Sequence, residues 1–477
     1  MKKILRPILC GGVLAALLCT PSLAAEQGDF SLLVNGEPVA FTDAAPVLKD
    51  GRSFLPVATT FQALGFAQED IVWNGETQSV TASKDGTTIS LTVGDSAVTW
   101  TGPSWSQTSE DGTSGSAGGS GGIAYLDAAP YIDPATNRTY IPVGLVADIL
   151  GCRVAWDGAT STVIIDDVDA ILAENTETYE RMDQYLDYAR KYSQGNYQVE
   201  GSYLLTSAPG EMESGAEIIH TVGGGYSMVT NQTAMQFAMD MSISGTIMGA
   251  PIAPTDMNLD MRADLDTGML YLYFQSEDLE QLMNNNVQVN GESVEFQIPD
   301  QWYSLDMKAV YDEAYGPGFY EELIALSTAS QEAAFAQTLE KLLKSDTLIL
   351  TSTATTSDYL EALNQLLGDS HFQKSGSTYT STLEQDGVTI LFHLYTSGGQ
   401  VNGYGMEMTA SETTGMEMTM TMEMKGDDMS LLMEMAGMTM EMDGTYRPSS
   451  AAPETEPPAG ATVVDLWELL TTPVSEL

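Results

Sequence analysis

The feature that most constrains the fold is a regular alternation of methionine with polar residues near the end of the chain. Thirteen of the chain's 26 methionines lie between Met406 and Met442. In the stretch MEMTMTMEMK (416–425), every second residue is methionine, and Glu, Thr or Lys stands between them. A period of two places successive side chains on opposite faces of a β-strand. The stretch therefore predicts strands with one methionine face and one polar face.

The same period recurs after the turn sequence KGDD (425–428) and again after Ala436-Gly437, which predicts an antiparallel meander. It is also present at 235–243 and 257–265, where Phe, Ile and Leu share the methionine positions. A ligand of a metal ion cannot be exchanged for leucine, whereas a core residue can. Core packing by an adaptable side chain is therefore our preferred interpretation of the alternation.

Two alternatives stay open for the methionines. Thioethers are soft ligands that suit Cu(I), and neighbouring strands would have to contribute them, because residues i and i+2 of one strand are ~7 Å apart. The face could instead line a groove that carries an apolar ligand, such as a lipid or a lipidated chain. The residues that would line this groove are Met416, Met418, Met420, Met422, Met424, Met433, Met435, Met438 and Met440.

The charge balance excludes one class of partner. The chain has 18 Lys and Arg against 66 Asp and Glu, and a net charge of −48. Such a surface repels phosphate backbones, so nucleic acid is not expected as a partner.

The N-terminus predicts export. A basic start, an apolar run and the small-residue sequence Ser22-Leu23-Ala24 are typical of a secretory leader over residues 1–24. Leu18 stands before Cys19 where a lipoprotein signal requires a small residue, so we do not expect lipid anchoring at Cys19. The expected location is extracellular or associated with the cell envelope, without a transmembrane segment in the mature chain. Loss of the leader would leave Cys152 alone, as a buried small hydrophobe.

One unit of sequence is used twice in the first third of the chain. DAAPVLKDGRSFLPVATTFQALG (43–65) is repeated as DAAPYIDPATNRTYIPVGLVADILG (127–151). Each copy predicts a short strand, then a helix that ends at Gly65 or Gly151, and then a strand with a core tryptophan, Trp73 or Trp156. A Gly/Ser-rich segment (102–122) separates the copies and is expected to be a solvated loop.

The paired pattern VNG, GR-[ST]-x-x-P, LG and W over about residues 30–167 resembles the copper amine oxidase-like N-terminal domain, also called a stalk domain. The resemblance implies a spacer or binding module of α+β type. It does not imply oxidation, because copper and the quinone cofactor of those enzymes belong to a separate catalytic domain with a His-x-His pair. This chain has only three histidines and no such pair. Ala58 and Gly144 also stand where the family often carries arginine.

The remaining two thirds predict a second region of strands with interposed helices. A helical stripe over 168–193 precedes it, and helices are expected at about 308–344, broken at Gly316-Pro317-Gly318, and at about 356–368. This arrangement, with the strand QWYSLDM (301–307), resembles the lipoprotein-carrier (LolA-like) half-barrel family. That resemblance implies a groove between sheet and helices that holds a lipid or a lipidated chain.

The sequence thus predicts an α+β protein: a small duplicated α+β stalk module, then an antiparallel, methionine-rich β half-barrel with packed helices. The expected boundaries are a leader at 1–24, the stalk domain at 25–167, a connecting helix at 168–194, the β-rich domain at 195–447, a Pro/Glu linker at 448–460 and a C-terminal amphipathic helix at 461–477.

No motif of a hydrolase, a P-loop or a Cys/His metal cluster is present in the sequence. We therefore expect neither catalytic residues nor a cofactor. The favoured function is a secreted, non-catalytic binding or presentation module, and its partner is an unidentified cell-envelope protein or polymer. The alternatives are a carrier of an apolar small molecule and, less favoured, a Cu(I)-binding protein.

Overall fold

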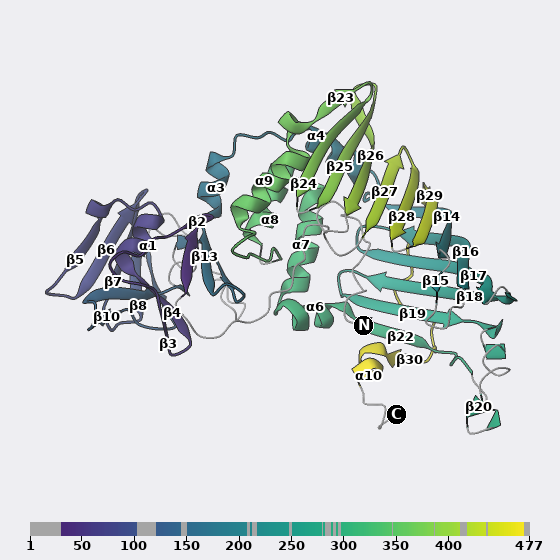
Figure 1. Ribbon diagram of the computed structural model, residues 1–477, viewed down its shortest axis with the longest axis horizontal. Helices are drawn as coiled ribbons and strands as arrows, with labels where there is room; N and C mark the ends of the chain where they lie inside the picture. Colours follow the sequence, from purple (N-terminus) through teal and green to yellow (C-terminus); the bar gives the residue numbers. More distant parts are fainter. Residues whose placement is uncertain are drawn as a thin grey trace. The chain divides into compact units, whose positions relative to one another are not determined.

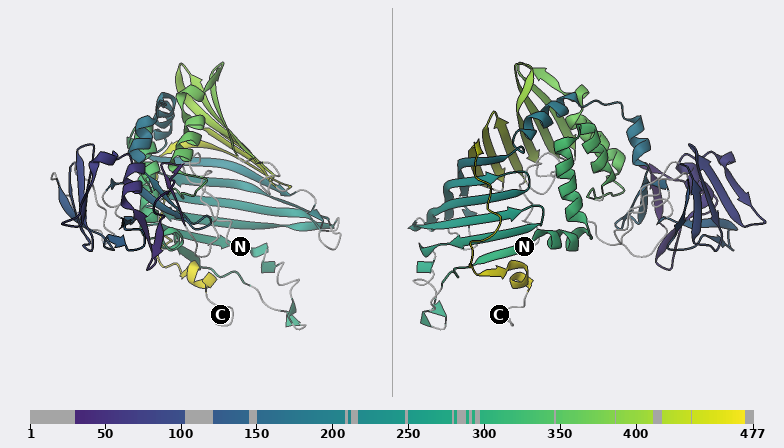
Figure 2. Two further views of the ribbon diagram at one scale, coloured as in Figure 1. Left: turned by 60° about the vertical axis from the view of Figure 1, so that its left-hand side comes forward. Right: turned by 180° about the vertical axis from the view of Figure 1, so that it is seen from behind.

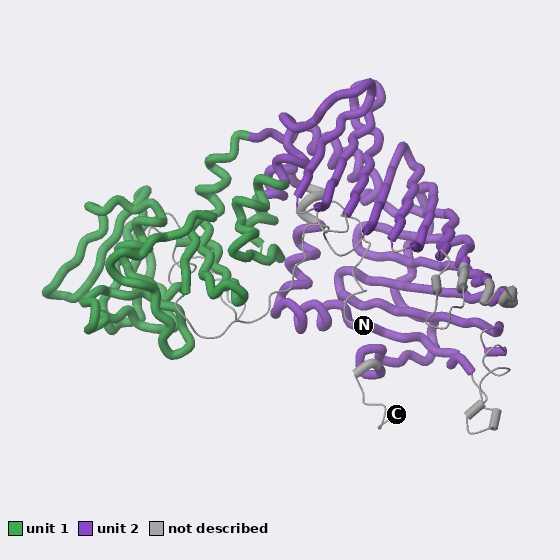
Figure 3. The backbone as a smooth tube through the Cα atoms, viewed as in Figure 1, with its two compact units in different colours: residues 1–176, 340–362 green, residues 177–339, 363–477 purple. Residues whose placement is uncertain are grey.

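A computed structural model describes residues 30–102, 121–144, 150–207, 210–211, 217–247, 250–278, 280–281, 288–289, 292–293, 297–345, 347–385, 387–410, 417–435 and 437–471. The expected leader, most of the Gly/Ser-rich loop, most of the second repeat's helix and Met416 lie outside these residues. The chain forms two compact units (Figure 3). Unit 1 consists of Met1–Thr176 and Glu340–Ala362, and unit 2 consists of Glu177–Leu339 and Leu363–Leu477.

The described part of unit 1 has three small sheets, a short helix α1 (Val57–Ala63), a 3-10 turn η2 (Gln68–Asp70) and helix α3 (Val168–Glu174) (Figure 1). The sheets have the strand orders β12-β13-β1-β2, β10-β11-β4-β3 and β5-β6-β7-β8-β9. Their strands are β1 (Ser31–Val34), β2 (Glu37–Pro38), β3 (Val47–Lys49), β4 (Arg52–Pro56), β5 (Ile71–Asn74), β6 (Ser79–Lys84), β7 (Thr87–Thr92), β8 (Ala97–Thr101), β9 (Gly122–Tyr125), β10 (Tyr131–Asp133), β11 (Arg138–Pro142), β12 (Arg153–Asp157) and β13 (Thr162–Asp166).

The two sequence repeats pair with each other in unit 1. Strands β4 and β11 are antiparallel, and Leu55 lies opposite Ile141 at the middle of the pair. The matched Arg and Asp residues are exchanged across the repeats: Arg52 Nε is 2.6 Å from Asp127 Oδ2, and Arg138 pairs with Asp43. These exposed ion pairs contribute little stability. Their reciprocity shows that the duplication has become one interlocked module.

The core of unit 1 confirms one expectation for this region and contradicts another. Cys152 is buried among apolar side chains, and burial raises the pKa of its thiol to about 12, so it is an unreactive packing residue. The prediction that Trp73 and Trp156 fill the core is wrong, because their side chains are 45% and 51% exposed. Both lie on strands at the edges of their sheets, β5 and β12, and the Trp156 ring makes an edge-to-face contact with Phe30 (6.1 Å).

Residues 340–362 pack onto strands β12 and β13 within unit 1, although the sequence placed them inside the β-rich region. The Arg153 guanidinium donates hydrogen bonds to the Leu343 and Leu348 carbonyl oxygens. Asp157 Oδ2 accepts a 2.9 Å hydrogen bond from the Ser352 amide. The buried Asp166 carboxylate accepts one of 3.1 Å from the Thr356 amide.

The main sheet of unit 2 has the strand order β23-β24-β25-β26-β27-β28-β29-β14-β16-β17-β18-β19-β22-β30, and β15 pairs with β16 (Figures 1 and 2). Its neighbouring strands are antiparallel except for the pair β22–β30. The α+β fold class with its half-barrel sheet is therefore confirmed. The strands are β14 (Asn196–Ser207), β15 (Gly210–Glu211), β16 (Glu217–Thr230), β17 (Ala234–Ile247), β18 (Ala250–Asp264), β19 (Met269–Gln275), β22 (Trp302–Asp306), β23 (Gln373–Ser375), β24 (Thr378–Gln385), β25 (Val388–Ser397), β26 (Gln400–Ala410), β27 (Met418–Lys425), β28 (Asp428–Met435), β29 (Met438–Ser449) and β30 (Val463–Asp465). A separate two-stranded sheet is formed by β20 (Gln288–Val289) and β21 (Glu292–Ser293).

The helices that follow unit 1 depart in one respect from the sequence expectation. In place of one connecting helix over 168–194, the chain has α3 and then α4 (Glu180–Arg190), separated by residues 175–179. The helices expected between 308 and 368 are present as α6 (Met307–Tyr315), α7 (Phe319–Glu332), α8 (Phe335–Lys344) and α9 (Thr356–Leu367), followed by the 3-10 turn η3 (Asp369–His371). The division between the units passes through α8 and α9.

The C-terminal segment adds to the edge of the main sheet. The Pro/Glu stretch crosses β18, where the Arg262 guanidinium pairs with Glu454 (2.7 Å) and donates to the Glu456 carbonyl oxygen (2.5 Å). Val463–Asp465, expected as helix, is strand β30 and pairs in parallel with β22. Helix α10 (Leu466–Thr471) begins only after it. Unpaired backbone groups at the edge of β22 explain the difference, because a strand satisfies them and a helix does not.

Candidate functional site

The strands of unit 2 share one continuous apolar face, which we call the methionine face. It comprises Met418, Met420, Met422 and Met424 of β27 together with every residue in register with them on the same side of the sheet. One row of directly opposed residues runs Met408, Met420, Met433, Met440, Leu205 and Val222 across β26, β27, β28, β29, β14 and β16. Directly opposed side chains have Cβ atoms about 4.5–5.5 Å apart, so each row is a continuous apolar track.

From β24 to β19, charge is separated between the two faces of this sheet; on the edge strand β23, Lys374 lies on the same side as Tyr379 and brings a charge to that end of the face. Among the described residues between Tyr379 on β24 and Phe274 on β19, the methionine face carries no Asp, Glu, Lys or Arg side chain. The opposite face of the same strands carries many carboxylates, among them Glu407, Glu423, Glu434, Glu441, Glu200 and Asp240. In a chain with 66 acidic residues, this separation leaves one extended uncharged surface.

Helix α4 and the turn after it cover one end of the methionine face through side chains spaced by three or four residues: Arg181, Tyr185 and Tyr188 of the helix and Tyr192 of the turn. The Tyr185 ring lies edge-on to Phe392 (6.0 Å) and to Tyr404 (5.1 Å). Tyr188 Oη donates a 2.6 Å hydrogen bond to the Gly426 carbonyl oxygen at the β27–β28 turn. Beneath these side chains, Phe392 and Met406 are buried.

In β27 and β29, burial falls along the strands away from α4, whereas Ile390 and Ala410 on β25 and β26 stay buried. Met406 and Met424 are 2% and 6% exposed, whereas Met438 is 39% exposed. Between these extremes lie half-buried residues of three adjacent strands: Met418, Met420, Met422, Met429, Leu431, Met433, Met435, Met440 and Met442. Figure 1 shows α6 and α7 at one end of strands β16 to β19, which continue beyond these helices. An extended apolar surface that keeps contact with solvent is a common mark of a binding site.

Glycines shape the middle of the methionine face. The Tyr226 ring lies over Gly201 and Gly444, where an added Cβ would be 2.7 Å and 2.2 Å from the Tyr226 hydroxyl oxygen. That hydroxyl donates a 2.9 Å hydrogen bond to the Asp443 carbonyl oxygen, and burial raises the pKa of Tyr226 to about 12. The site therefore combines flexible thioethers with a ring held in one position.

The residues that the sequence predicted to line a groove, where the structure describes them, all lie on one face of the sheet. They differ in how far they are exposed. Met418, Met420, Met422, Met433, Met435, Met438 and Met440 lie on the half-buried or exposed part of this face, whereas Met424 is buried beside Tyr404. The sequence interpretation predicted the helix and missed the sheet contact made by this row of tyrosines. Its signal was the spacing of Tyr185, Tyr188 and Tyr192, which marks a second helix face besides Met182 and Leu186.

The register also bears on the copper hypothesis. Met420, Met433 and Met440 lie opposite one another on neighbouring strands, which is the arrangement that hypothesis requires. In the part of the chain that the structure describes, no group of three or more His, Cys, Asp or Glu side chains could hold a metal ion. Copper binding by thioethers stays a prediction.

Comparison with known proteins supports the first resemblance. Residues 33–165 match the family model described as the copper amine oxidase N-terminal domain, which is not the catalytic domain of that enzyme. No curated protein matches the chain. A crystal structure of a beta-barrel-like protein of a domain of unknown function from Brucella abortus is similar over 53% of this chain and 98% of that chain, at 10% identity and a TM-score of 0.19. That similarity is too low to support an argument. Within the described residues, no helix is long and apolar enough to cross a membrane.

Proposed function

We propose that this protein is an exported, non-catalytic binding protein that holds an apolar ligand, a lipid or an acyl chain, on the methionine face of unit 2. The observation that carries this proposal is the complete absence of charge from a partly exposed face that spans strands β24 to β19, within the described residues. An acyl chain needs no hydrogen bonds, and methionine side chains adapt to ligands of varied shape.

Net charge favours a small ligand over a second copy of the chain on this face. Each chain has a net charge of −48, and acidic side chains occupy the opposite face of the same strands. Two such chains repel each other when they approach, whereas an uncharged acyl chain meets no such barrier.

The first unit would then serve as a spacer or presentation module. This role rests on the match of residues 33–165 to the copper amine oxidase N-terminal domain and on the leader-like sequence at 1–24. In this proposal, the mature chain acts outside the cell or at the cell envelope, and unit 2 is the part that binds.

Two neighbouring residues of β28 provide a matched test of the binding face. Met433 lies on the methionine face and Leu432 on the opposite face, so M433E and L432E introduce the same carboxylate on opposite sides. Burying an unpaired carboxylate against an acyl chain costs more than about 2 kcal/mol. We therefore expect M433E to weaken the binding of a fluorescent fatty acid at least about tenfold, and L432E to leave it unchanged.

Native mass spectrometry of the purified full chain completes the test. The proposal requires a non-covalent apolar molecule, or a saturable uptake of added fatty acid at fixed stoichiometry. Stoichiometric copper with no lipid, a dimer that blocks fatty-acid uptake, or equal effects of M433E and L432E would each overturn it.

A further inference from the structure

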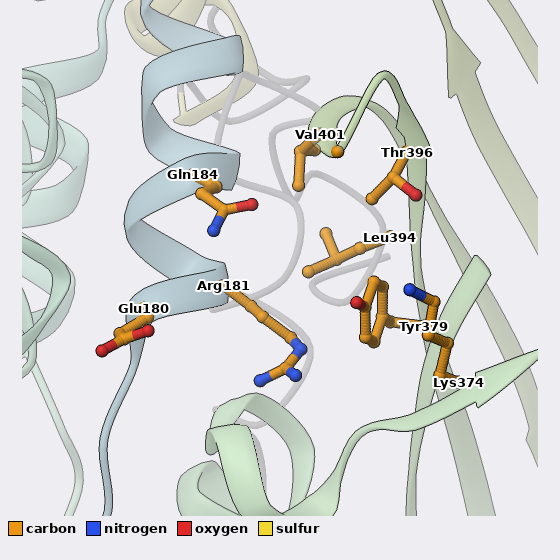
Figure 4. A pocket seen from close by; sticks show the side chains of 9 residues that line it. Glu180, Arg181, Gln184, Lys374, Tyr379, Leu394, Thr396 and Val401 are labelled. Carbon is orange, nitrogen blue, oxygen red and sulfur yellow. The ribbon is translucent and has the colours of Figure 1, made fainter. Parts of the chain in front are cut away.

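A cavity lies between α4 and the β23–β26 end of the methionine face, wholly within unit 2. It has a volume of about 140 Å³ and is lined by Glu180, Arg181, Gln184, Lys374, Tyr379, Leu394, Thr396, Gly399 and Val401. This volume is roughly ten times the 10–15 Å³ that one water molecule needs, so the cavity can hold a group of several heavy atoms. Figure 4 shows Arg181 reaching from α4 toward Tyr379 and Lys374 of the facing strands.

Two cations meet at one aromatic ring in this cavity. The Arg181 guanidinium carbon is 4.6 Å from the centre of the Tyr379 ring, and Lys374 Nζ is 5.0 Å from it. Acidic residues outnumber basic ones 66 to 18 in the chain. Two cations at one small cavity are therefore unusual for a surface with this composition. Lys374 forms no ion pair with a carboxylate within the described residues.

Two carboxylates lie close to these cations, and one of them pairs with Arg181. Asp369 pairs with Arg181 Nη1 at 3.0 Å, and its oxygens also accept the Glu180 and Arg181 amides that begin α4. Arg181 Nε is buried and has no hydrogen-bond partner. Glu180 lines the rim, and in Figure 4 its carboxylate points away from Tyr379. Arg181 thus shares its charge with Asp369, whereas Lys374 has no carboxylate partner within the described residues.

The remaining walls suit a small polar group with a short apolar part. The Gln184 amide of α4 and the Tyr379 hydroxyl point into the same space, and Leu394 and Val401 add apolar surface on the sheet side (Figure 4). The hydrogen bond from Lys374 lowers the pKa of the Tyr379 phenol, which indicates a positive potential at that oxygen.

We infer that this cavity is a binding site for a small oxyanion, a carboxylate or a phosphate group, held by Arg181, Lys374 and the Tyr379 hydroxyl. Guanidinium and ammonium groups form the strongest hydrogen bonds with such anions. The inference does not depend on the apolar ligand, because the Tyr185 contacts with Phe392 and Tyr404 separate the cavity from the half-buried methionines.

Calorimetric titration of the full chain with inorganic phosphate and with acetate, at constant ionic strength in chloride, tests the site. The expected result is saturable binding of at least one of the two anions at one site per chain. K374Q removes an exposed cation without touching the core, and should weaken this binding about tenfold. Q184W narrows the cavity without a change of charge and should abolish it.

Lys341 supplies the matched control, since it is an exposed lysine of α8 that lies outside the cavity. K341Q makes the same charge change and should alter the affinity less than about twofold. Octyl phosphate and decanoate distinguish the sources of the anion. Tighter binding than that of the short anions, weakened by K374Q in the same way, identifies a lipid headgroup, and equal binding identifies a free anion. Absence of saturable binding, or equal losses in K374Q and K341Q, would overturn the inference.

Discussion

The hydrogen bonds that attach residues 340–362 to unit 1 allow a quantitative prediction for Asp157. Its side chain belongs to a residue only 5% exposed and accepts hydrogen bonds from the Ser352 amide (2.9 Å), the Thr160 hydroxyl (2.8 Å) and the Ala159 amide (2.9 Å). Burial by itself would raise the pKa of this carboxyl. The hydrogen bonds outweigh it and lower the pKa from 3.8 to about 2.

The size of the effect follows from linkage. Each pKa unit corresponds to about 1.36 kcal/mol, so a fall from 3.8 to about 2 stabilises unit 1 by about 2 kcal/mol. Because the pKa is lowered in the folded state, this contribution is fully present above about pH 4. It is lost as the pH falls from 3.8 towards 2.

The D157N variant removes the charge and keeps the shape of the side chain. An amide in this position still accepts one hydrogen bond, but its NH₂ group faces donors. We expect D157N to lower the free energy of unfolding of unit 1 by about 2 kcal/mol at pH 7, and the melting temperature of its transition by about 5 °C. Thermal unfolding of the full chain between pH 2 and pH 8, followed by circular dichroism, measures both.

The pH dependence separates this mechanism from a simple loss of packing. The difference between wild type and D157N should shrink below pH 4, because the wild-type carboxylate then becomes protonated. D70N provides the control, since Asp70 is exposed in the turn η2. The reasoning would be refuted if the loss of unfolding free energy in D157N stayed constant down to pH 2. It would also be refuted if that loss were no larger than the loss in D70N.

Two further predictions concern the main sheet of unit 2. An added Cβ at Gly224 would lie 1.8 Å from the Asp240 carbonyl oxygen, whereas at Gly225 the nearest atom is 3.8 Å away. In urea denaturation, G224A should therefore lower the free energy of unfolding by at least about 2 kcal/mol, and G225A by less than about 0.5 kcal/mol. Equal losses in the two variants would contradict the register described. Dilute hydrogen peroxide should convert the exposed Met438 to its sulfoxide well before the buried Met406, and peptide mass spectrometry follows both reactions. Simultaneous oxidation of the two residues would show that the methionine face is not partly exposed as described.

Much of the architecture follows from local patterns in the sequence. The period of two between Met418 and Met424 determines a strand with one apolar face, since the pleat leaves no other placement for alternating side chains. The duplicated motif around Arg52 and Arg138 determines the module at the start of the chain for a similar reason, because each copy carries its own strand, helix and turn signals.

The assembly of these pieces depended on contacts between distant residues. Pairing of β14 with β29, which joins residues 196–207 to 438–449, extends the methionine face beyond the meander, and no local pattern specifies it. Only the tertiary structure placed α4 over Met406 and left Met438 exposed, so it alone divides the core from the proposed binding surface. It also exposed Trp73 and Trp156, because hydrophobicity predicts burial only where another element covers the strand. A sequence states which side of a strand is apolar, but what covers that side is decided by segments far away along the chain.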